Sequence, residues 1–164
     1  MALGNRYKSA PGAGTLAAFL LVLIFGSPWY LNWVDKNISD TSAGGWWLHL
    51  LAWPHWQFNS HDSVRTILVG DLKAILLVLF TWVFLLMLPG TQLARARGTV
   101  SQFLAGWAAS IFAGGFASLI ATLFLHNPSL LGAFHEAGVG ASYGLFVGWI
   151  VGLATLGGFR GSRS

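Results

Sequence analysis

Cysteine is absent from this chain of 164 residues, and charged residues make up only 9% of it. The lack of cysteine excludes disulfide bonds, thiolate metal sites and a cysteine nucleophile. Soluble domains contain roughly 25% charged residues, so the low charge together with 55% hydrophobic residues indicates a chain embedded in lipid. A Gly-rich phosphate loop, a Gly-x-Ser-x-Gly elbow and an HExxH motif are also missing. We therefore expect a membrane protein that is not an enzyme.

Four apolar stretches near the length that crosses a bilayer core divide the chain at about 15–31, 67–88, 101–125 and 139–157. The sequence therefore predicts an all-α integral membrane protein with four transmembrane helices. They would form one domain over 15–158, between cytoplasmic tails at 1–14 and 159–164. Too little chain remains for a separate soluble domain.

Acidic residues and histidines are confined to the two loops expected outside the membrane and to the adjoining start of the second apolar stretch. They are Asp35, Asp40, Asp62, Asp71, Glu136, His49, His55, His61, His126 and His135. The tails and the central loop contain no acid, and their basic residues are Arg6, Lys8, Arg95, Arg97, Arg160 and Arg163. Because Lys and Arg accumulate in cytoplasmic segments, both termini are expected in the cytoplasm of a multi-pass plasma (inner) membrane protein.

Small residues recur at every fourth position in the last two predicted helices. The third carries Gly106, Ser110, Gly114 and Ser118, and the fourth carries Gly140, Gly144, Gly148 and Gly152. Residues four apart share one helix face, and a face of small residues lets two backbones approach closely in lipid. The rows predict helix-packing faces. The neighbouring helix, another copy and a different protein are all open as the partner.

Asp71 and Lys73 form a candidate polar site at the start of the second predicted helix. Ionisable side chains at membrane depth are costly and often functional. Positions two apart point about 200° from each other on a helix, so the two cannot pair directly. Asp71 could face the helix bundle as a cation or proton site, whereas Lys73 is expected to extend outward to the headgroups. Alternatively, both are boundary residues at headgroup level.

The first outer loop contains a segment rich in aromatic residues, which includes Trp46, Trp47, Trp53 and Trp56. The segment is too short to cross a membrane, so we expect a short helix in the interface that ends near Pro54. Tryptophan is favoured at membrane interfaces and at protein contacts, and this loop could serve either.

The five histidines show no spacing typical of a metal site. A site would have to be assembled across loops, for example from His49, His126, His135 and Glu136. Known zinc and copper sites have recognisable ligand sets. We therefore expect no metal and no cofactor.

These observations favour a non-catalytic accessory or scaffold subunit of a larger plasma-membrane complex. One alternative is an oligomeric small transporter or channel with Asp71 as its cation or proton site. Another is an outer-face binder of lipid, quinone or metal. The expected partners are membrane lipids and other membrane subunits or further copies of the chain. Nucleic acid is not expected, because the basic residues lie in pairs beside apolar segments.

Overall fold

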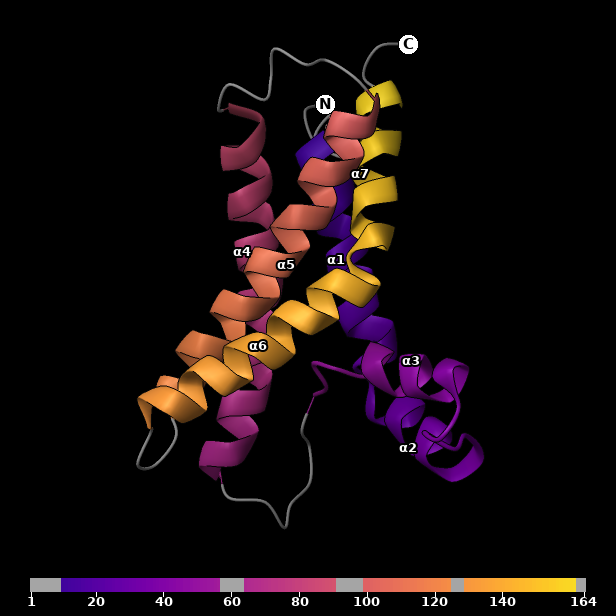
Figure 1. Ribbon diagram of the computed structural model, residues 1–164, viewed down its shortest axis with the longest axis vertical. Coiled ribbons are helices and arrows are strands. Elements are labelled where there is room, and N and C mark those ends of the chain that lie inside the picture. The colour runs from indigo at the N-terminus through magenta and orange to yellow at the C-terminus, as the bar shows by residue number, and fades with distance from the viewer. Residues whose placement is uncertain (1–9, 57–63, 91–98, 125–128, 162–164) are drawn as a thin grey trace, which may run out of the picture.

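The computed structural model describes residues 10–56, 64–90, 99–124 and 129–161. All regular secondary structure in these ranges is helical (Figure 1). The helices are α1 (Ala10–Phe25), α2 (Pro28–Asn37), α3 (Ala43–Leu51), α4 (Val64–Gly90), α5 (Thr99–Leu123), α6 (Leu130–Val147) and α7 (Trp149–Gly161). The all-helical class is therefore confirmed. By length and composition, α4 and α5 could each cross a membrane alone, and the bent pairs α1–α2 and α6–α7 could each form one broken span.

Helix α5 occupies the centre of the bundle, where it packs against α4, α6 and α7. The start of α1 and the end of α7 lie at the same end of the molecule, the top in Figure 1, and these two helices pack together. Helices α2 and α3 lie at the opposite end, and α6 crosses the bundle obliquely. Helix α1 begins at Ala10, within the predicted tail, and Gly14 is buried beside Thr155 and Leu85.

The first predicted span is not one straight helix, because α1 and α2 meet at a bend of 60°. Pro28 opens α2, and the Ser27 hydroxyl accepts a hydrogen bond from the Tyr30 amide, as an N-cap residue does. The Gly26 carbonyl accepts from the Trp56 amide at 2.9 Å. The segment after α3 thus supplies a hydrogen-bond donor for a backbone carbonyl beside the bend between α1 and α2.

The fourth predicted span, 139–157, is also interrupted, and its helix starts earlier than expected. Helix α6 begins at Leu130, nine residues before the predicted span, and it meets α7 at a bend of 54°. At the bend, the Leu145 carbonyl accepts from the Trp107 indole at 2.8 Å, and the Phe146 carbonyl accepts from the Trp47 indole at 3.2 Å. Helices kink where side chains enter the backbone hydrogen-bond ladder. Two indoles therefore mark the position of this bend.

The two rows of small residues meet inside this chain. A Cβ atom added at Gly114 would collide with the Gly140 carbonyl, and one at Gly144 would lie 2.5 Å from the Ile111 Cα. Further along, Gly106 lies against Gly152. Helices α5, α6 and α7 can approach this closely only because these positions lack side chains.

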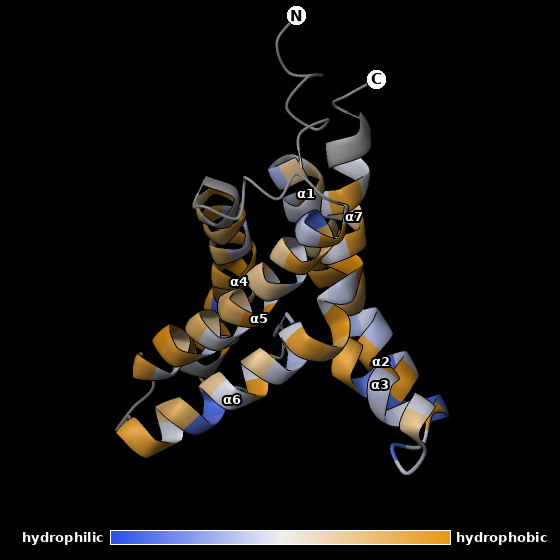
Figure 2. Cartoon of the chain, turned by 45° about the horizontal axis from the view of Figure 1, so that its top comes forward, coloured by the Kyte–Doolittle hydropathy of each residue, from blue (hydrophilic) through white to orange (hydrophobic). Residues whose placement is uncertain are grey.

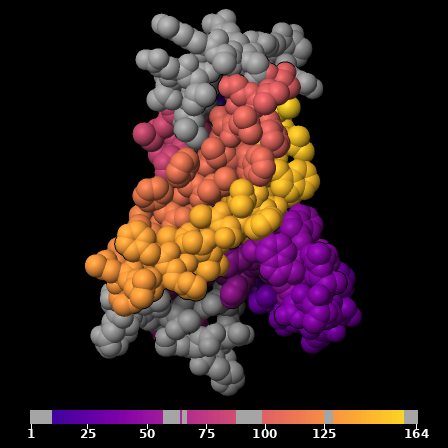
Figure 3. Space-filling model, viewed as in Figure 1, coloured from indigo at the N-terminus to yellow at the C-terminus, as the bar shows by residue number. Residues whose placement is uncertain are grey.

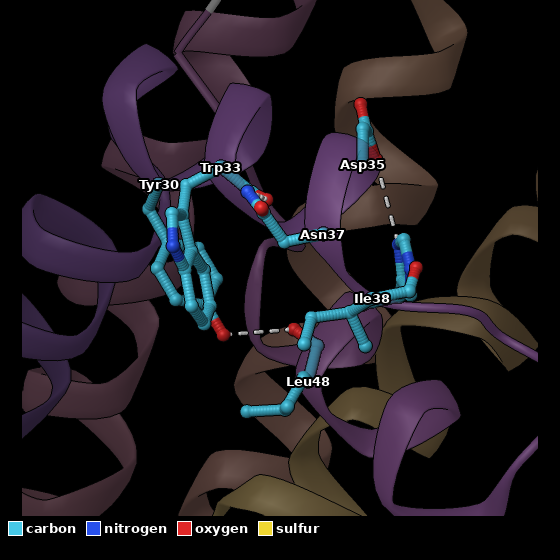
Figure 4. A network of polar contacts seen from close by, with 7 residues as sticks. Tyr30, Trp33, Asp35, Asn37, Ile38 and Leu48 are labelled. Atoms are coloured by element: carbon cyan, nitrogen blue, oxygen red, sulfur yellow. Dashed lines mark hydrogen bonds and ion pairs between the residues drawn. The ribbon is translucent and has the colours of Figure 1, made fainter.

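Helices α2 and α3 form a hairpin at the end opposite the chain termini (Figure 1), and polar contacts join them (Figure 4). The Tyr30 hydroxyl donates to the Leu48 carbonyl at 3.1 Å. The His49 ring lies 3.1 Å from the Ile38 carbonyl through Nε2 and 3.5 Å from the Asp35 carboxylate through Nδ1. These contacts join the two short helices into one unit.

Candidate functional site

Lys73 lies on the buried face of α4. Leu77 and Thr81 follow it at intervals of four residues, and their exposed fractions are only 3% and 1%. Positions four apart share a helix face, so the Lys73 side chain points from α4 toward the helix bundle. Its side chain is 17% exposed, and its Nζ atom lies 3.2 Å from Glu136 Oε2. The expectation that Lys73 extends outward is therefore wrong, because a carboxylate on α6 offers it a partner within the protein.

This ion pair lies on the wall of an open cavity of about 270 Å³. We call it the Lys73–Glu136 pocket, and it is lined by Trp53, Pro54, His55, Gly70, Lys73, Glu136 and Val139. The lining comes from the segment after α3, from α4 and from α6. In Figure 3, the first half of α6 extends away from the α2–α3 hairpin. Hydropathy colouring shows a hydrophilic stretch in that half of α6 (Figure 2).

The Trp53 ring forms a second contact with the lysine. Lys73 Nζ lies 5.5 Å from the ring centroid, within the range of a cation–π interaction. On its other side, Trp53 approaches Tyr143 of α6, with 4.9 Å between the ring centroids. The ammonium group is therefore held by one carboxylate and one indole at the wall of the pocket.

His55 contributes a neutral ring to the pocket at neutral pH. Burial lowers the pKa of His55, and the nearby positive charge of Lys73 lowers it further, whereas Asp35 has an opposing effect. Among the described residues, the charged side chains that line the pocket are then Lys73 and Glu136, one of each sign.

Acidification is expected to reduce the stability of the folded chain through His55. The unfolded histidine takes up a proton near pH 6.5, whereas the folded form does so only at lower pH. Stability therefore decreases as the pH falls below that unfolded value and levels off below the folded pKa. Thermal unfolding in detergent as a function of pH measures the slope. His55→Gln should reduce the dependence of stability on pH. His135→Gln, at an exposed site on α6, is the control and should keep that dependence. The same pH dependence in the wild-type protein and both variants would contradict the assignment to His55.

Asp71 lies away from the Lys73–Glu136 pocket. It borders a different, largely apolar hollow of about 470 Å³, together with Leu68, Leu72, Ile75 and Phe124 among others. The structure thus separates the two members of the predicted polar site. The sequence spacing of two residues already indicated that they point in different directions.

The tryptophans of the predicted outer loop mostly face the protein. Trp47 and Trp56 donate their indole N–H groups to the carbonyls of Phe146 and Val22, both at 3.2 Å. Trp46, with 44% exposure, packs edge-on against Phe146. Trp53 belongs to the pocket. Their contacts with other helices give these tryptophans a structural role within the chain.

Loss of the Trp47 indole donor is expected to destabilise the fold measurably. Trp47→Phe keeps an aromatic ring but leaves the Phe146 carbonyl without that hydrogen bond, which should cost about 1 kcal/mol. Chemical unfolding in mixed micelles measures the change. Trp46→Phe is the matched control, since it retains a ring at a neighbouring, more exposed position. An equal effect of the two substitutions would rule out the indole donor as the cause.

The residues considered for a metal site are dispersed. His49 contacts Asp35, Glu136 contacts Lys73, and His135 is exposed on α6. His126 lies outside the described residues. Within the described ranges, no three side chains from His, Asp and Glu come close enough to hold a metal ion together.

The pairing of Lys73 with Glu136 was missed by the sequence reasoning. The two residues are 63 positions apart, and Glu136 was assigned to a loop. The spacing of Lys73 from Leu77 and Thr81 was the available signal, because it places the lysine on a face that continues into the bundle.

Comparisons with protein-family models, with curated proteins and with solved structures found no match to this chain.

Proposed function

We propose that this chain is a non-catalytic membrane protein that binds the headgroup of a membrane lipid in the Lys73–Glu136 pocket. The observation that carries the proposal is the ion pair at 3.2 Å on the wall of an open cavity beside Trp53 and His55. Charged groups inside membrane proteins usually face partners or cavities and mark functional sites. A few convergent polar groups in a concave site are also typical of ligand binding.

The size of the pocket fits a headgroup, and the depth of Lys73 requires the headgroup to enter the pocket. Lys73 lies six residues into the apolar segment Ile67–Met87 of α4, which corresponds to roughly 9 Å along a helix. In a bilayer core about 30 Å thick, such a position lies within the hydrocarbon of one leaflet, so a headgroup reaches Lys73 only by entering the open pocket. The cavity of about 270 Å³ is at the lower limit of small-molecule sites, which extend from roughly 300 to 1,000 Å³. It can therefore hold a headgroup while the acyl chains remain outside.

Native mass spectrometry of the purified chain with added phospholipids tests this proposal. The wild-type protein should retain bound lipid after the micelle is removed. In the double variant Lys73→Met with Glu136→Leu, apolar side chains of similar size replace the two charges. This variant should lose most of its bound lipid. Equal lipid retention by both proteins would refute the headgroup site.

A role as an accessory subunit is a second candidate. It is supported by the first half of α6, which packs on α5 but leaves Leu130, Leu131 and Phe134 strongly exposed. Aromatic and large apolar side chains are common at contacts between membrane subunits as well as against lipid. Purification from the native membrane in a mild detergent, followed by mass spectrometry, tests this role. Constant heterologous partners would support it, and a closed homo-oligomer would contradict it.

A further inference from the structure

Resting on the proposed headgroup site, we propose that its ligand is a zwitterionic aminophospholipid, whose phosphate pairs with Lys73 and whose primary ammonium pairs with Glu136. The ligand class is that of phosphatidylethanolamine. The pocket offers one positive and one negative group that already lie 3.2 Å apart. A headgroup with the same two charges in the opposite order can satisfy both groups at once.

The charge balance disfavours an anionic lipid. Such a headgroup would gain the attraction of Lys73 but would also bring a negative charge toward Glu136. A protonated histidine could compensate for that repulsion. However, burial and the charge of Lys73 lower the pKa of His55, so at neutral pH it adds no second positive charge. A ligand without net charge therefore fits the pocket better.

The walls leave room for a phosphate beside the lysine. Gly70 lines the pocket three residues before Lys73 on α4, and positions three apart are neighbours on a helix surface. Because Gly70 has no side chain, it places no side-chain atoms beside the lysine on that face of α4. The lysine ammonium has three donors, and its contact with Glu136 occupies one of them. Donors thus remain for phosphate oxygens.

The nitrogen of the ligand headgroup should be a primary ammonium, as in ethanolamine, rather than a quaternary one, as in choline. Glu136 is 38% exposed, so its carboxylate is accessible to an N–H donor. A choline group has no N–H donor, and its usual partner in proteins is the face of an aromatic ring. In this pocket, the Trp53 ring already receives the Lys73 ammonium at 5.5 Å. The arrangement therefore favours ethanolamine over choline.

Lipid competition in detergent micelles tests the inference, with native mass spectrometry as the readout. The probes are dioleoyl phosphatidylethanolamine, phosphatidylcholine and phosphatidylglycerol at equal concentrations. We expect wild-type protein to prefer phosphatidylethanolamine over the other two by roughly tenfold, the effect of one charge-assisted hydrogen bond. Glu136→Gln should abolish this preference. Asp71→Asn is the matched control, because Asp71 does not line this pocket, and it should leave the preference intact.

A charge-reversed variant covers the case in which the single variant fails to fold. Lys73→Glu with Glu136→Lys keeps one charge of each sign, so it should bind the same zwitterion in the opposite orientation with its preference retained. Soluble glycerophosphoethanolamine distinguishes a lipid from a free headgroup, and it should not displace the lipid at equal concentration. Displacement of the lipid by this compound would overturn the preference for phosphatidylethanolamine while leaving the headgroup site intact, and so would equal binding of the three lipids by wild-type protein. If wild-type protein and the uncharged double variant retain lipid equally, the headgroup site itself is refuted.

Discussion

Gly114→Ala is expected to lower the free energy of unfolding by about 2–3 kcal/mol, the upper part of the range for overpacked interiors. The added Cβ atom would collide with the backbone carbonyl of Gly140 rather than with a side chain that could rotate away. Helices α5 and α6 must then separate. Because Glu136 precedes Gly140 by one helical turn, this separation should also withdraw Glu136 from Lys73. Thermal unfolding and lipid retention of the purified variant measure the two effects.

Gly138→Ala is the matched control for this substitution. Gly138 lies on the same helix as Gly140, but an added Cβ atom would have no heavy atom within 4 Å. We expect a change within about 0.5 kcal/mol, as for most surface substitutions. Similar losses of stability in Gly114→Ala and Gly138→Ala would show that close backbone approach is not what joins α5 to α6.

Glu136→Gln is expected to destabilise the fold by about 2 kcal/mol. Removal of one partner from a fully buried ion pair costs roughly 3–5 kcal/mol, because the other charge remains uncompensated. Here the cost is smaller, because neither side chain is fully buried: Lys73 is 17% exposed and Glu136 38%, so water in the open pocket partly screens the remaining charge of Lys73. Chemical unfolding in mixed micelles measures the loss.

The double variant Lys73→Met with Glu136→Leu separates the ion pair from general packing. Replacement of both charges by apolar groups of similar volume is often neutral, so the double variant should recover most of the stability lost by either single variant. A double-mutant cycle with Lys73→Met and Glu136→Leu gives the coupling energy directly. Additive losses would show that the two charges do not interact energetically.

The helical class could be predicted because apolar segments of this length and composition leave few alternatives. The approximate extents of α4 and α5 follow from the same runs. The rows of small residues were also visible, and in the structure Gly114 of one row meets Gly140 of the other. Periodicity could not identify that partner, because a small-residue face fits a neighbouring helix and another protein equally well. The number of membrane spans and the side on which the termini lie stay predictions.

The bends and the pocket could not be predicted because both depend on contacts between distant parts of the chain. The bend near Gly148 coincides with hydrogen bonds from Trp47 and Trp107, which come from two other helices. Trp47 belonged to the segment for which composition alone suggested a surface for lipids or partners. Lys73 was likewise assigned to the headgroups, because the carboxylate opposite it is remote in sequence.

The two bends give the molecule a tapered outline. Helix α2 and the first half of α6 both turn away from the long axis at the end opposite the chain termini, and they do so in different directions (Figure 2). That end is therefore broader than the end where α1 and α7 pack together. A protein with this outline that crosses a bilayer displaces more lipid from one leaflet than from the other.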